Sequence, residues 1–190
     1  MTVIKPADPE PKPYPPSWID SFTRWLDSFR LPYFVVIILF YLLFVFISHL
    51  LEWTYKGKPW WDLSYELFVY SLFTAEVLFF LRYIDRDADS ALEQFKPLLN
   101  MGEHEIERLR YRLTVLPARP VLIVTLFGIA FGIFMGYSTQ VFLSGSFNLS
   151  IALIWDTSGF LIADVLALLF VYRVVVQMRT VNRLYASAAE

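Results

Sequence analysis

Two long apolar runs constrain the fold of this chain more than any other feature. Leu31 to Leu51 and Pro120 to Trp155 contain no Asp, Glu, Lys or Arg. A helix needs roughly 20 apolar residues to cross the hydrocarbon core of a bilayer, so the first run crosses once and the second must turn. With 57% hydrophobic residues among 190 and a mean hydropathy of +0.50, the composition is too apolar for an ordinary soluble domain. The sequence predicts an all-α integral membrane protein.

The apolar segments predict a four-helix transmembrane bundle built from two hairpins. Residues 31–82 form hairpin 1 and residues 119–172 form hairpin 2. Between them, residues 83–118 are polar and predict a cytoplasmic insert of two short helices, separated near Pro97 to Gly102. Residues 173–190 continue helically out of the fourth span and reach Glu190 without a glycine or proline stop. Such an end is what one would see if a longer polypeptide had been cut there, and the alternative is that the four-span bundle is the whole protein.

The residues before the first span predict two further segments. Residues 1–16 are proline-rich and predict a disordered tail. Residues 17–30 predict an amphipathic helix that begins after Ser17 and carries Trp18 and Trp25 on its apolar side. We expect this helix to lie in the headgroup layer. The alternative is that its apolar stripe packs on the bundle.

The distribution of Lys and Arg predicts the orientation in the membrane. Most of these residues fall in the tail, the amphipathic helix, the insert and the last segment, and only Lys56 and Lys58 fall on the other side. Cytoplasmic loops retain Lys and Arg, so both termini are predicted to be cytoplasmic in a multi-pass protein of the cell membrane.

Small residues recur at four-residue steps in the third and fourth spans. They are Gly128, Gly132 and Gly136 in one span, and Gly159, Ala163 and Ala167 in the other. Small faces let helix backbones approach closely in lipid, so we expect these two spans to pack on each other. The alternative is that the glycine face joins two copies of the chain.

Two carboxylates lie within the spans. A charge in the hydrocarbon is costly, so Glu76 and Asp164 should each face protein or water. They form either an ion or proton site or hydrogen bonds that tie helices together.

Several polar residues lie at matching depths near the outer ends of the spans. Imidazole and carboxylates can bind a divalent metal, but charged residues at span ends usually reach water, so no metal site is predicted. This outer-face polar cluster comprises His49, Glu52, Asp62, Glu66 and Asp156.

Motifs leave the function open and exclude some classes. The chain has no cysteine, which excludes disulfides and thiolate sites. It has no basic face for nucleic acid and no catalytic motif, so no catalytic residue and no cofactor are predicted. The leading hypothesis is a membrane-embedded sensory or regulatory module, whose partners are the lipid bilayer and either a second copy or another membrane protein. The alternatives are a proton- or cation-coupled transport subunit that uses Glu76 and Asp164, and a membrane-bound enzyme acting on lipid.

Overall fold

A computed structural model shows an all-helical chain and describes residues 13–55, 57–98, 101–144 and 151–188. The side chains of 98, 139–144, 151–157 and 185–188 lie outside this description. The elements are α1 (Trp18–Asp27), α2 (Tyr33–Tyr55), α3 (Tyr65–Phe95), a short 3-10 turn η1 (Lys96–Leu98), α4 (Glu103–Thr114), α5 (Ala118–Ser144) and α6 (Ile151–Ala188).

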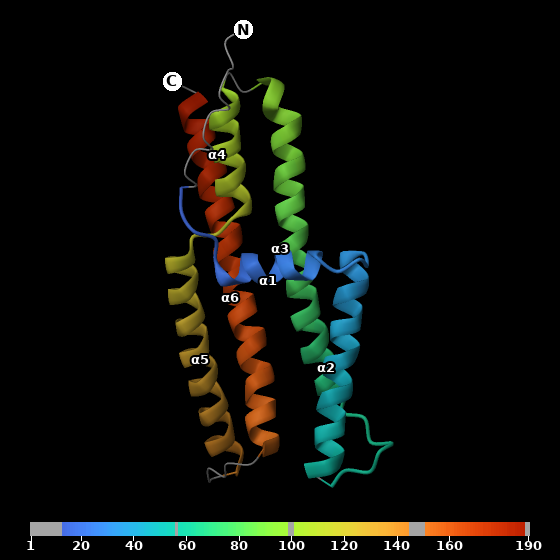
Figure 1. The fold of residues 1–190 in the computed structure, drawn as a ribbon. Helices are drawn as coiled ribbons and strands as arrows, with labels where there is room; N and C mark the ends of the chain where they lie inside the picture. The colour runs from blue at the N-terminus through green and yellow to red at the C-terminus, as the bar shows by residue number, and fades with distance from the viewer. Residues whose placement is uncertain (1–12, 56, 99–100, 145–150, 189–190) are drawn as a thin grey trace.

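The helices form two hairpins whose inner members continue beyond the bundle (Figure 1). α2 pairs with α3, α5 pairs with α6, and α3 packs on α6. Past the point where α1 crosses, α4 packs against the extensions of α3 and α6; we call this the α4 end. In the described part of the chain, α2, α3, α5 and α6 are long and apolar enough to cross a membrane.

α3 differs from the helix that we expected to stop near Arg82. It continues unbroken to Phe95, so the first half of the insert belongs to α3 and is not a separate helix. No proline or glycine lies between Arg82 and Phe95, and the backbone therefore has no reason to break there. The break comes at η1, which contains Pro97, and α4 then begins after Gly102.

α1 begins at a capping box and lies across the bundle (Figure 1). The Asp20 backbone N–H donates to the Ser17 hydroxyl at 3.3 Å, and the Ser17 backbone N–H donates to the Asp20 carboxylate at 3.1 Å. This confirms Ser17 as the N-cap. Ile19 and Leu26 enter the core, whereas Trp25 is exposed. The helix thus packs on the bundle while presenting aromatic side chains outward.

The end of the proline-rich tail is docked, contrary to our expectation for residues 13–16. The Tyr14 hydroxyl donates to the Val115 carbonyl at 2.9 Å, and the Tyr111 hydroxyl donates to the Tyr14 carbonyl at 2.7 Å. Burial, followed by the neighbouring Tyr111, raises the pKa of Tyr14 to about 12, so this phenol remains a donor at neutral pH. Residues 1–12 lie outside the described part of the chain.

Two apolar cores stabilise the arrangement. The larger core gathers residues of α1, α2, α3, α5 and α6 around Leu26, Leu81, Val121 and Leu169. The smaller core lies at the α4 end, where Leu92 of α3 packs with Ile106, Leu109 and Leu113 of α4.

Glycines bring α5 close to α6. A Cβ added to Gly128 would lie 2.9 Å from Val165 Cγ2 and 3.2 Å from Val165 Cα, and one added to Gly132 would lie 2.5 Å from Leu161 Cδ2. Ala163 is also buried. Gly159 instead faces the ring of Phe44 on α2 at 3.4 Å. The faces of Gly128 and Gly132 are therefore occupied within one chain.

Enlarging Gly132 should weaken this packing. We expect Gly132→Leu to lower the free energy of unfolding by about 1–3 kcal/mol, because the added side chain would overlap Leu161 Cδ2 and crowd Asp164 Oδ2, so that α5 and α6 must repack. Thermal unfolding in detergent measures the effect. Ala130→Leu, on the exposed side of the same helix, is the control and should change little. Equal stability of both variants would contradict the packing described.

Candidate functional site

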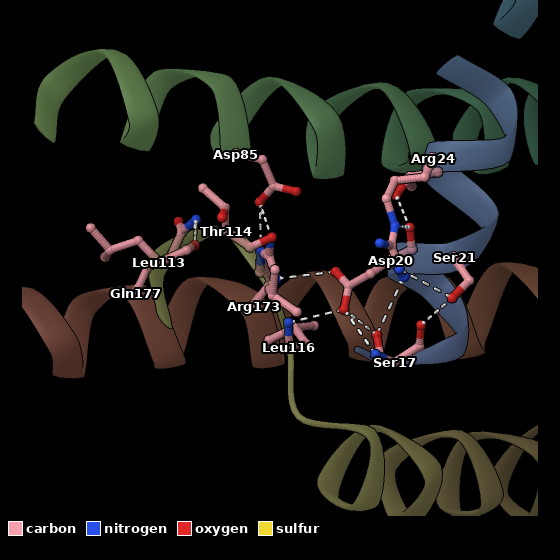
Figure 2. A network of polar contacts seen from close by, with 12 residues as sticks. Ser17, Asp20, Ser21, Arg24, Asp85, Leu113, Thr114, Leu116, Arg173 and Gln177 are labelled. Atoms are coloured by element: carbon pink, nitrogen blue, oxygen red, sulfur yellow. Dashed lines mark hydrogen bonds and ion pairs between the residues drawn. The ribbon is translucent and has the colours of Figure 1, made fainter. Parts of the chain in front are cut away.

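Arg173 of α6 is the largest of the fully buried side chains in the described part of the chain. Its Nε donates to Asp85 Oδ1 of α3 at 2.6 Å, and its Nη2 donates to the same oxygen and to the Thr114 carbonyl at the end of α4. Its Nη1 lies 3.5 Å from Asp20 Oδ1 of α1. One guanidinium therefore joins four helices (Figure 2).

Asp20 extends this network to the linker before α5. Its Oδ2 accepts from the Leu116 backbone N–H at 3.0 Å and from the Ser17 hydroxyl at 2.6 Å. The carboxylate that caps α1 is thus also a partner of Arg173 and of the α4–α5 linker, as the converging sticks of Figure 2 show. A further bond, from Gln177 Nε2 to the Leu113 carbonyl at 3.1 Å, ties α6 to α4.

Ion pairs around the network hold the same elements together at their exposed edges. Asp27 of α1 pairs with Arg82 and lies 3.7 Å from Arg86 of α3. Arg110 of α4 pairs with Asp89 at 2.7 Å and with Glu93, both on α3. These pairs are more exposed than the Arg173 network, so each contributes less to stability.

A second polar network closes the opposite end of hairpin 1. His49 Nδ1 lies 2.9 Å from the Val45 carbonyl, and the Ser64 backbone N–H donates to His49 Nε2 at 3.2 Å. Because Nε2 accepts from the Ser64 backbone, Nδ1 is the ring nitrogen that donates to the Val45 carbonyl. Lys58 Nζ lies 3.2 Å from both oxygens of Glu52, and the Ser64 hydroxyl donates to Glu52 as well. The turn between α2 and α3 is thereby fastened to α2.

The carboxylates of the predicted outer-face polar cluster differ in the exposure of their side chains. Asp62 and Glu66 are exposed, whereas Glu52 is buried; all three line a cavity of about 470 Å³ between hairpin 1 and α6. The side chain of Asp156 lies outside the described residues, as does any contact it makes. Within the described residues, no group of three His, Cys, Asp or Glu could hold a metal ion.

The structure does not bring Glu76 and Asp164 together. Asp164 faces α5, where its Oδ2 lies 3.2 Å from the position of a Cβ on Gly132. Glu76 is exposed and lines a groove between α2 and α3. Asp164 thus faces protein, whereas for Glu76, which is exposed in this chain, the expectation that each carboxylate faces protein or water stays a prediction.

An apolar cavity of about 550 Å³ lies between the two hairpins, beside the packing of α3 on α6. α1 borders it through Trp18, whose Nε1 donates to Thr125 Oγ1 of α5 at 2.9 Å. Two hydroxyls in its wall are satisfied within their own helix: Ser71 donates to the Leu67 carbonyl and Thr74 to the Tyr70 carbonyl. The space between the hairpins is thus lined almost entirely by carbon.

Sequence analysis missed Arg173, Asp85 and Asp20 as a group. Arg173 could have been noticed, because it interrupts an apolar stretch from Val165 to Val176 in which an unpaired cation would be costly. Asp20 and Asp85 lie among other charged residues, so nothing local distinguishes them. Comparison of the chain with protein-family models, curated proteins and solved structures finds no match.

Removing the guanidinium should destabilise the protein strongly. We expect Arg173→Met to cost about 3–5 kcal/mol, because Asp85 and Asp20 are left buried without their cation. Thermal unfolding measures the loss, and adding Asp85→Leu to the same chain should restore part of it. Arg179→Met, at an exposed position of α6, is the control. A loss no greater than that of the control would contradict the role given to Arg173.

Removing Glu52 should loosen the turn between α2 and α3. Glu52→Ala removes the carboxylate that accepts from Lys58 and from the Ser64 hydroxyl, so we expect the turn to open about tenfold more often. Hydrogen exchange at the Ser64 amide measures the opening. Glu66→Ala, at an exposed position nearby, should leave exchange unchanged, and equal rates in the two variants would argue against the network.

Proposed function

We propose that the chain is an integral membrane protein and acts as a sensory or regulatory module, in which α6 carries a change in the bundle to the cytoplasm. The observation that carries this proposal is the continuity of α6, one helix from Ile151 to Ala188. It packs on α5 and α3 within the bundle and on α4 beyond it. A rigid helix of this length connects the two ends of the molecule without a hinge.

The contacts of Arg173 support α6 as the moving element. They lie about midway along α6 and link it to α1, α3 and the end of α4. A shift of α6 must therefore change these contacts together, and such helix shifts are typically about 1–2 Å. In this proposal, the positions of α1 and α4 report the state of the bundle on the cytoplasmic side.

The outer end supplies an input for this movement. The cavity beside α6 combines the buried Glu52 with Lys58 and Asp62, while Tyr70 and Phe160 form an aromatic pair between α3 and α6 with ring centroids 4.4 Å apart. A change in this cavity would act on hairpin 1 and on α6 at the same time. The apolar cavity between the hairpins gives α6 room to move relative to α2.

Distances between spin labels test the proposal. The chain has no cysteine, so Gln94→Cys on α3 and Arg183→Cys on α6 place a unique pair of labels at the α4 end. In lipid vesicles, we expect Glu52→Gln at the other end to shift the distance between the labels by about 1–2 Å. Double electron–electron resonance measures the distribution of distances between the two spin labels.

Two controls make the outcome decisive. Labels at Val171→Cys and Met178→Cys, both exposed on α6, should keep their distance because one helix holds them. Glu66→Gln, exposed at the outer end, should leave the first pair unchanged. If Glu52→Gln loosens the turn but does not move the labels on Gln94→Cys and Arg183→Cys, α6 does not transmit the change and the proposal is wrong.

A further inference from the structure

Glu76 lies in an apolar groove on the outer surface of hairpin 1. The groove measures about 400 Å³ and runs between α2 and α3, with Phe34, Ile38 and Phe79 in its walls and Ala75 beside the carboxylate. Glu76 is exposed. Among the described residues, none makes a hydrogen bond or ion pair with it.

The position of Glu76 along α3 makes this exposure costly in the proposed membrane. It precedes Arg82, which pairs with α1, by six residues, or about 9 Å along the helix. Leu72, Phe73 and Phe80 around it are also exposed. A carboxylate at this depth that faces hydrocarbon costs a few kcal/mol, and such residues normally face protein.

This chain has no cation to offer at that depth. No Lys or Arg occurs between Pro59 and Leu81, or between Pro120 and Tyr172. Arg82 is held by Asp27, and Arg173 is held by Asp85 and Asp20. A second copy could therefore bring no Lys or Arg to Glu76 at this depth.

We propose that the groove between α2 and α3 binds a transmembrane helix of a different membrane protein, one that carries Lys or Arg within the membrane opposite Glu76. The charge of Glu76 sets the depth and the sign of the partner residue, while the apolar groove accepts the remainder of the helix. The inference rests on the proposed membrane insertion and is independent of transmission through α6.

A synthetic helix tests the inference directly. The probe is a leucine-rich peptide of about 20 residues with one lysine at the depth of Glu76, and the control peptide has leucine at that position. The full chain, labelled at Pro59→Cys, is mixed with each peptide in phosphatidylcholine vesicles, and energy transfer measures association. We expect the lysine peptide to bind about tenfold more tightly than the control peptide.

Two variants test whether the tighter binding of the lysine peptide depends on Glu76. Glu76→Leu should abolish the preference for lysine, and it should fold because it replaces an exposed carboxylate with an apolar side chain. Asp164→Asn neutralises the other carboxylate of the spans, which faces α5, and should keep the preference. Equal binding of both peptides, or a preference that survives Glu76→Leu, would overturn the inference.

Two further measurements distinguish a second copy in the groove from a failure of the chain to insert. Energy transfer between differently labelled copies of the chain, without peptide, should not depend on Glu76; if it does, a second copy occupies the groove and the inference is wrong. Protease protection in the same vesicles reports insertion. If the chain fails to insert, both the inference and the proposed function are wrong. If it inserts but binds the lysine peptide no more tightly than the control peptide, the inference alone is wrong.

Discussion

The burial of one guanidinium determines how the segments of this chain meet. Arg173 is withdrawn from water, and its donors must then be matched by acceptors within the protein. Asp85 and the Thr114 carbonyl accept hydrogen bonds from it, and Asp20 forms an ion pair with it at 3.5 Å, so that three other helices contribute partners. Each partner is in reach only when its helix is in place, so a single side chain of α6 links the positions of α1, α3 and the end of α4.

The polar networks described above are concentrated at two levels along the bundle, and apolar side chains fill most of the region between them. The network of Arg173 lies where α1 crosses the bundle, and the network of Glu52, Lys58 and Ser64 lies at the turn of hairpin 1. Between these levels α3 packs on α6 through apolar side chains beside the apolar cavity, and α5 and α6 approach through glycines. The described polar networks between helices thus lie mainly at two levels with apolar packing between them, an arrangement that suits the proposed shift of α6.

The apolar pattern predicted the four long helices and Ser17 as the N-cap of α1, because both depend on residues close in sequence. Networks between distant residues were not predictable in this way. Asp20 resembles any solvated residue of an amphipathic helix, and only its distance from Leu116 and Arg173 in space identifies it as buried. The continuation of α3 to Phe95 was missed because polar composition suggested a new segment, although the backbone had no residue that would end the helix. Orientation in the membrane and the role of the outer-face cluster remain predictions.

The order in which the partners of Arg173 occur along the chain has a consequence for biosynthesis. Asp20 and Asp85 leave the ribosome long before Arg173, which lies in α6. Until Arg173 has been synthesised, Asp20 at the start of α1 and Asp85 in the middle of α3 lack the cation with which they pair in the folded protein. The contacts between these helices therefore cannot all form in the order of synthesis, and assembly of the Arg173 network must wait for α6.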